Sequence, residues 1–215
     1  MNNKYNDVNS KLKKYIIHNV FPLYSQNDTA HGLKHIEYVI SRSLDFAATV
    51  PNINYDMVYT IAAYHDIGHH INPDKHEEFS ANLLATDIGL IEFFAYEDIT
   101  IMTEAVADHR ASLKGVPRSI YGKIVSSADR NTSVDDSIKR SYAYRLCHMS
   151  NASDVEIIEA CRQHLLEKFG KFGYARTKMY FDDPAYRKYI KEITALASDS
   201  VAFANRSQAV NSIKS

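Results

Sequence analysis

The feature that most constrains the fold is the spacing of apolar residues, which recur every three or four positions along nearly the whole chain. This period places them on one face of an α-helix, whereas a half-buried strand would alternate every two residues. No segment shows convincing two-residue alternation, so we predict an all-α fold of roughly eight to ten helices. The clearest stripes are Leu12, Tyr15 and Ile16; Ile36, Val39, Ile40, Ser43, Leu44 and Ala47; and Met57, Val58, Ile61 and Ala62.

Helix boundaries and domain limits follow from capping residues and composition. No stretch rich in proline, glycine or serine divides the 215 residues, so we predict a single domain over 1–215. Within it we expect a core over about 28–135, a helical extension over about 136–200 and a frayed tail over 201–215, where the side chains are small and polar. The predicted caps and stops are Pro51, Gly68, Asp98, Ser153 with Glu156, and Asp183 with Pro184.

Composition limits the class of partner. The 25 Lys and Arg residues balance 26 Asp and Glu residues, so we expect no long nucleic acid as a partner, because such binding needs excess positive charge. The first residues lack the apolar core of a signal peptide, and no apolar run could span a bilayer, so we expect a cytoplasmic protein without membrane contact. Cys147 and Cys161 form no CxxC pattern and are expected to be reduced thiols. The sequence leaves a homo-oligomer open.

The stretch AAYHDIGHH over residues 62–70 places an imidazole, His65, beside a carboxylate, Asp66, at the end of an apolar helical run. Burying both groups is unfavourable unless a partner uses them, and a divalent cation can bind both. His31 stands near the start of the second predicted helix, and Asp129 ends a short apolar helix. Two neutral nitrogens and two anionic oxygens suit Mn, Fe, Co, Ni or Mg better than a closed structural zinc site.

Two further histidines lie on core-facing positions. His109 continues the stripe of Met102, Ala105 and Val106, and His76 opens a helix whose apolar face points the same way. His35 shares a face with His31 and is interpreted chiefly as structural, although it could support a metal ligand. His69 and His70 follow the glycine of the predicted helix end and are interpreted as capping or surface residues.

The wording around these residues resembles the HD superfamily of metal-dependent phosphohydrolases, whose signature is a His, an adjacent His-Asp pair and a distant Asp. The similar segments are HGLKHIEYV, AAYHDIGHH, HEEFSANL, VADHRAS and IVSSADR, within roughly residues 28–135. The resemblance implies a helical domain that binds one divalent metal through His31, His65, Asp66 and Asp129. Branches of the family with two metals use two more histidines between the pair and the last Asp, and His76 and His109 stand at such positions.

The resemblance implies hydrolysis of a nucleotide or related small phosphate ester by a metal-activated water, with Asp66 as metal ligand and orienter of the water. The HD pair is followed neither by the Glu-Asp of alarmone hydrolases nor by the Gly-Tyr-Pro of cyclic-dinucleotide phosphodiesterases, which favours a mononucleotide. Arg110, Lys114 and Lys34 are the predicted phosphate-binding residues. The general acid is left open among Asp74, Glu77 and Asp108. The alternatives are a di-iron oxygenase on the same scaffold and a non-catalytic nucleotide-binding module.

Overall fold

The computed structural model describes residues 7–28, 31–176 and 178–212, and over these ranges it is all helical, without a strand. The predicted all-α class is confirmed. Two compact units divide the chain, Met1–Asp129 and Arg130–Ser215. The first unit contains α1 (Ser10–Asn19), α2 (Leu33–Ala47), α3 (Tyr55–Tyr64), α4 (His76–Ala85), α5 (Tyr96–Ala107) and α6 (Ile120–Ala128), with short 3-10 turns η2 (Phe21–Gln26), η4 (Pro73–Lys75) and η5 (Ile88–Glu92).

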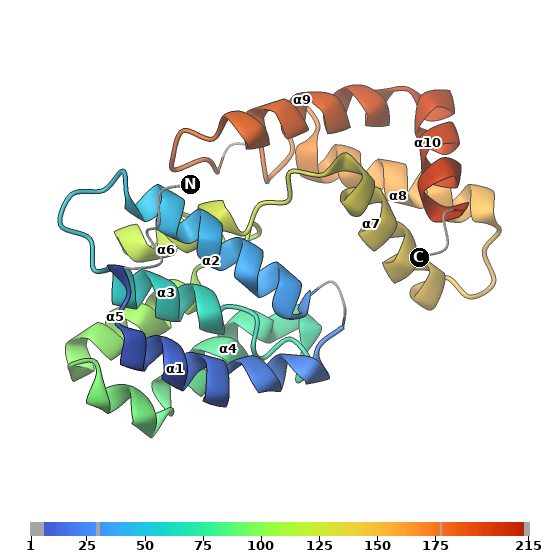
Figure 1. Cartoon of the computed structure of the whole chain (residues 1–215). Coiled ribbons are helices and arrows are strands. Elements are labelled where there is room, and N and C mark those ends of the chain that lie inside the picture. The colour runs from blue at the N-terminus through green and yellow to red at the C-terminus, as the bar shows by residue number, and fades with distance from the viewer. Residues whose placement is uncertain (1–6, 29–30, 177, 213–215) are drawn as a thin grey trace. The chain divides into compact units, whose positions relative to one another are not determined.

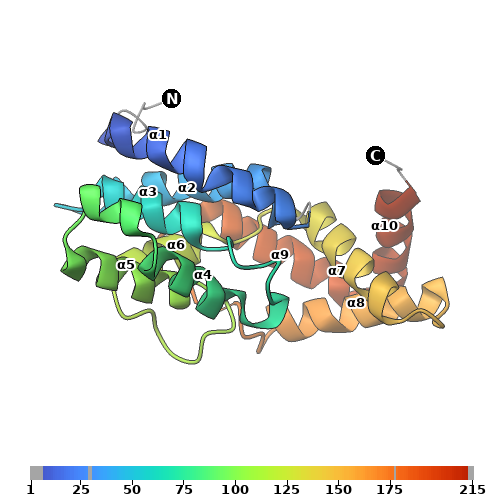
Figure 2. The ribbon, with the colours of Figure 1, turned by 90° about the horizontal axis from the view of Figure 1, so that it is seen from below.

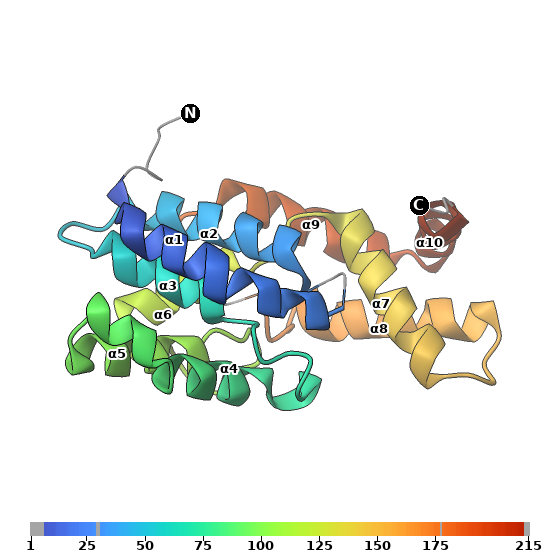
Figure 3. The same ribbon diagram turned by 60° about the horizontal axis from the view of Figure 1, so that its bottom comes forward.

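Helix α3 forms the centre of the first unit. All its residues from Met57 to Tyr64 are buried, which is the pattern of a helix covered on every side. It packs against α2, α5 and α6, and Figure 1 shows α2 and α3 side by side. Helices α4 and α5 form a second close pair (Figure 3). The residues that follow α3 therefore emerge into the middle of the unit.

The end of α3 differs from the sequence-based expectation. The helix ends at Tyr64, not at Gly68, and residues 65–71 form turns. Gly68 is needed for the approach of this segment to α4, because a Cβ there would lie 2.7 Å from the Cβ of Phe79, and its N–H donates to Ser80 Oγ at 2.9 Å. The glycine thus allows a tight helix-to-turn contact. Likewise the N-cap position of α5 is Ala95, which provides no side-chain hydrogen bond. Asp98 lies inside the first turn, where its negative charge interacts favourably with the helix dipole.

The second unit contains α7 (Val134–His148), α8 (Asp154–Phe169), α9 (Pro184–Ser198) and α10 (Ser200–Ser212). Helix α8 packs against α7 and α9, and α10 contacts all three (Figure 2). The capping box of Ser153 and Glu156 is confirmed, and Asp183 caps α9 by accepting from Tyr186 N at 2.9 Å. The expected frayed tail is instead mostly helix α10, since Phe203, Ser207 and Val210 form a buried stripe at helical spacing. Residues 213–215 lie outside the described residues.

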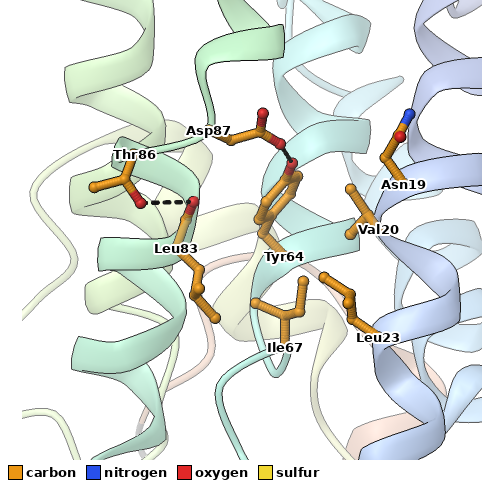
Figure 4. A pocket seen from close by; sticks show the side chains of 8 residues that line it. All are labelled: Asn19, Val20, Leu23, Tyr64, Ile67, Leu83, Thr86 and Asp87. Atoms are coloured by element: carbon orange, nitrogen blue, oxygen red, sulfur yellow. Dashed lines mark hydrogen bonds between the residues drawn. The ribbon is translucent and has the colours of Figure 1, made fainter.

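A small pocket in the first unit is lined by α1, η2, α3 and α4 (Figure 4). At its edge the Asp87 carboxylate accepts hydrogen bonds from the hydroxyls of Tyr64 and Tyr15 and from Gly89 N. This carboxylate fastens three segments together and has a structural role. No helix within the described ranges is long and apolar enough to cross a membrane, and Cys147 and Cys161 are both free thiols.

Candidate metal centre

His65 and Asp66 directly follow α3 and are buried, at 0% and 3% exposure. The His65 ring is fixed by a hydrogen bond between Nδ1 and the Ala62 carbonyl at 2.8 Å. The backbone at Asp66 is fixed as well, because Asn27 Nδ2 donates to its carbonyl at 2.9 Å. The rigid end of a buried helix therefore presents an imidazole and a carboxylate in defined orientations.

Three other side chains meet on one side of Asp66. His65 Nε2 lies 3.4 Å from Asp66 Oδ2 and 3.4 Å from His35 Nε2, while His35 Nε2 lies 3.5 Å from Asp66 Oδ2 and 3.1 Å from Asp129 Oδ1. Asp129 follows the last residue of α6, and that helix end is tied to α2 by Arg42 Nε, which donates to the Ala128 carbonyl at 3.1 Å. We call His35, His65, Asp66 and Asp129 the first group.

Two histidines meet the other oxygen of the same carboxylate. His76 Nε2 lies 3.2 Å from Asp66 Oδ1, and His109 Nε2 lies 3.5 Å from it. The two Nε2 atoms are 3.1 Å apart. His76 begins α4 and His109 follows α5. We call Asp66, His76 and His109 the second group, and Asp66 belongs to both.

The histidine tautomers fit metal ligands. His65, His76 and His109 each place Nδ1 within 2.7 to 2.8 Å of the carbonyl three residues earlier. A carbonyl only accepts, so Nδ1 carries the proton and Nε2 of the neutral ring has a lone pair. The Nε2 atoms of His76 and His109 would then face each other with two lone pairs, which is unfavourable unless a proton or cation lies between them. Such backbone-held imidazoles are typical of metal sites.

The pKa shifts in the two groups show that the buried carboxylates are stabilised by positive charge on the neighbouring histidines. Burial lowers the pKa of His35, but hydrogen bonds to Asp129 and Asp66 outweigh it and raise that pKa to about 9. Burial also lowers the pKa of His109, and the hydrogen bond and charge of Asp66 again raise it. Conversely, burial raises the pKa of Asp66, yet the histidines around it hold that pKa well below its usual range. Protons on histidine here occupy the place that a cation would take.

His31 is not in the first group, although the sequence placed it there. Its Nδ1 lies 2.9 Å from Asp28 Oδ1, and its ring stacks on that of His69 with centroids 3.7 Å apart. The physical reason is the helix start: Gly32 is the N-cap of α2, so His31 precedes the helix while His35 lies within its first turn. We call Asp28, His31 and His69 the third group. The ligand atoms of the second group, of the third group, and of His35, His65 and Asp66 in the first group lie within 4.8 Å of one another in each case.

The predicted phosphate-binding residues have different surroundings. Arg110 Nη1 donates to the Asp74 carbonyl at 2.5 Å and to Glu77 at 3.0 Å. Lys34 and Lys114 are exposed. Among the candidate general acids, Glu77 thus accepts from Arg110, and Asp108 accepts from Arg118 in a two-oxygen ion pair. The assignment of Arg110, Lys34 and Lys114 to substrate binding stays a prediction.

Sequence reasoning missed His35 and His69 as members of these groups. For His35 a signal was present, since it lies one turn before the buried Val39 on the stripe that faces the core, whereas His31 lies outside that helix. For His69 there was no periodic signal, because residues 65–71 form turns in which no helical face exists. We interpreted His69 as a capping or surface residue, whereas the structure places its ring against those of His31 and His76, at centroid distances of 3.7 and 5.2 Å.

Comparison with known families agrees with this geometry. No curated protein and no solved structure matches the chain. One family model does match, the HD domain, over residues 32–132. This range begins after His31 and includes His35, His65, Asp66 and Asp129, together with both histidines of the second group. Residues 32–132 therefore match the HD-domain family, in agreement with the resemblance of the local sequence motifs.

Proposed function

We propose that this protein is a metal-dependent phosphohydrolase with two divalent ions that share Asp66. The observation that carries the proposal is the division of one carboxylate between two histidine sets. Oδ2 of Asp66 faces His35 and His65, and Oδ1 faces His76 and His109. His35 and His65 on one side and His76 and His109 on the other, with Asp66 between them, would hold two ions, and a pair of ions could stabilise both the attacking and the leaving oxygen in phosphoryl transfer.

The bound ions would supply Lewis acidity, a water with a pKa lowered from 15.7 towards about 7, and charge for the phosphoryl oxygens. The chain's own residues keep the donors fixed. Backbone carbonyls hold His65, His76 and His109 with Nε2 towards the centre, and Asp129 gives the first group a second carboxylate. Mixed imidazole and carboxylate donors suit Mn, Fe, Co or Ni, and with more water ligands Mg.

The proposed substrate is a nucleotide, with a mononucleotide favoured, or a related small phosphate ester. The absence of both family variants after the HD pair supports this choice. We retain Arg110 as a substrate-binding candidate, because it directly follows His109 and pairs with Glu77, which directly follows His76. Glu77 Oε2 lies 4.0 Å from His76 Nδ1, so this ion pair lies next to one histidine of the second group. Lys34 and Lys114 are retained as exposed cations on the same domain.

The test is a screen of metal-stripped protein resupplied with Mn²⁺, Fe²⁺, Co²⁺, Ni²⁺ or Mg²⁺ against nucleoside mono-, di- and triphosphates. Phosphate and pyrophosphate release are measured separately, with Asp66→Ala as the matched inactive control. The expected result is release of phosphate or pyrophosphate that requires metal and is lost in Asp66→Ala. Nucleotide binding without release under every metal would instead indicate a non-catalytic module.

A di-iron oxygenase is the second candidate, and the contact of His76 and His109 with Asp66 favours it, since this chemistry requires a second metal. The two candidates differ in their demand for a redox-active ion. Turnover with Mn²⁺ or Mg²⁺ in the absence of dioxygen supports the phosphohydrolase. Activity that requires iron and consumes dioxygen supports the oxygenase.

A further inference from the structure

We infer that the third group, Asp28, His31 and His69, is an additional divalent cation site beside the shared Asp66 centre. These residues belong to neither of the two proposed metal positions. The chemistry of the group is mixed nitrogen and oxygen, which suits a transition ion such as Mn²⁺, Co²⁺ or Ni²⁺.

The side chains converge on one carboxylate. His31 Nδ1 lies 2.9 and 3.0 Å from the two oxygens of Asp28, and His69 Nδ1 lies 3.7 Å from Oδ2. The two imidazoles are nearly parallel, at 17°, so that both Nδ1 atoms point towards the same carboxylate. Two ligands on one ion, each at about 2.1 Å, are at most about 4.2 Å apart. The distances of 2.9 Å from His31 Nδ1 and 3.7 Å from His69 Nδ1 to oxygens of Asp28 lie within this limit.

The backbone around the group is held in place by Asn27. Its Nδ2 donates to the His31 carbonyl at 3.1 Å and to the Asp66 carbonyl at 2.9 Å, and its Oδ1 accepts from His70 N at 2.9 Å. One side chain thus joins the segment that carries His31 to the turn that carries His69. In addition, His31 N donates to Asp28 Oδ1 at 3.0 Å, which orients the carboxylate. Such orientation of ligands by neighbouring groups is typical of built metal sites.

The third group differs from the other two in exposure. The side chain of Asp28 is 54% exposed, that of His31 is 29% and that of His69 is 11%. Three protein ligands at a partly open position leave places for water or for an anionic ligand. We therefore expect the ion at the third group to bind with lower affinity and to exchange more readily than the two ions proposed at the buried centre. Its location beside the second group, with the rings of His69 and His76 5.2 Å apart, suits an ion that binds a phosphate oxygen of the substrate. This role rests on the proposed function, whereas the existence of the site does not.

The rival account is a plain ion pair, in which His31 donates Nδ1–H to Asp28 and no metal binds. A cation would replace that proton, so binding would release it. The two accounts differ in metal stoichiometry, which can be measured without any substrate.

The experiment is equilibrium dialysis of the metal-stripped full chain against Mn²⁺ alone, with bound metal measured per chain. We expect wild type to reach three equivalents, the last with the weakest affinity, and Asp28→Asn and His69→Ala to reach two. His18→Ala is the matched control, because His18 Nδ1 contacts the Lys14 carbonyl and His18 belongs to none of the three groups. It should retain three equivalents. Far-UV circular dichroism identifies folded samples, and the near-isosteric Asp28→Asn keeps the test valid if His69→Ala unfolds.

Equal saturation of wild type and folded Asp28→Asn would overturn the inference, whatever the number of ions that the Asp66 centre holds. This comparison does not depend on hydrolysis. If the proposed activity is absent but the third equivalent is lost in Asp28→Asn, the function fails while the site stands.

Discussion

The two units differ in the partners of their buried polar side chains. In Arg130–Ser215 two buried polar side chains have partners within the unit: Ser137 shares a hydrogen bond of 2.7 Å with Tyr189, and Asp183 caps α9. In Met1–Asp129 a pair of imidazole nitrogens instead lies on each side of Asp66, with 3.1 Å between the two nitrogens of one pair and 3.4 Å between those of the other. The first arrangement needs no added ion. The second has the side chains that could hold a cation.

The distribution of histidine follows the same division. Eight of the ten histidines precede Arg130, and six of them have ring contacts with one another, whereas His148 and His164 lie in the second unit. All three groups that could hold a metal ion, among the residues that the structure describes, lie in the first unit. Metal chemistry is thus expected from one unit, and helix packing and capping from the other. The following predictions test that division.

The largest expected effect is on Asp66 and Asp129. Asp66→Ala removes the carboxylate shared by two groups, and Asp129→Ala removes the second oxygen donor of the first group. Each should reduce metal-dependent hydrolysis by about three orders of magnitude or more while helical content is retained. Steady-state rates and circular dichroism measure this. Asp183→Ala, which removes a buried carboxylate of the second unit, is the control and should keep its rate. Substantial turnover in Asp66→Ala would end the assignment.

Features of the two units that depend on local helical patterns could be predicted from the sequence, whereas those that depend on where a helix begins could not. The helical class, the capping box at Ser153 and the cap at Asp183 follow from local patterns, and the structure confirms them. The convergence of His65, Asp66 and Asp129 was predictable from the HD signature. The sequence did not separate the surroundings of His31 from those of His35, because residues four apart share a helix face only if both are helical, and α2 begins after Gly32.

The residues that emerge from turns were less predictable. His69 lies in a segment shaped by the close contact of Gly68 with α4 and by the hydrogen bonds of Asn27, both of which are tertiary features. No periodicity along the chain encodes them. The division into units at Asp129 likewise reflects spatial contacts, and the prediction of a single domain stays a prediction.

The next effect concerns the second group. His76→Ala and His109→Ala should each lose about one metal equivalent, because either change leaves Asp66 Oδ1 with a single imidazole. The first group keeps its four members. Metal analysis after dialysis measures the loss, and His164→Ala from the second unit should retain the full content. An unchanged number of bound ions per chain in both variants would contradict a second ion at the Asp66 centre and indicate a mononuclear one.

A smaller effect is expected on stability as a function of pH. In metal-stripped protein the pKa of His35 is about 9, against an ordinary value of 6.5, so its stabilising contribution is full below pH 6.5 and is lost as pH rises through 9. The raised pKa of His109 acts in the same direction. From the His35 shift, the loss is about 3 kcal/mol at most.

With Mn²⁺ bound, the same histidines are neutral ligands, and metal affinity increases as protons are removed. Stability should then be constant or rise over pH 6.5 to 8.5. Urea unfolding with chelator and with Mn²⁺ compares the two slopes. Equal slopes in both conditions would contradict a metal held by His35.

The smallest expected effect lies in the second unit, where Asp183 accepts from Tyr186 N at the start of α9. Removal of an N-cap side chain costs about 1 kcal/mol, because one backbone N–H loses its partner. Asp183→Ala should therefore lower the free energy of unfolding by about that amount with metal and without it. Asp182→Ala is the matched control, because its carboxylate is exposed and pairs with Arg187, and solvent screens such a surface pair so that its loss changes stability little. If Asp183→Ala also reduced the number of bound ions, the second unit would take part in forming the metal centre, and the division between a metal-binding unit and a helix-packing unit would no longer hold.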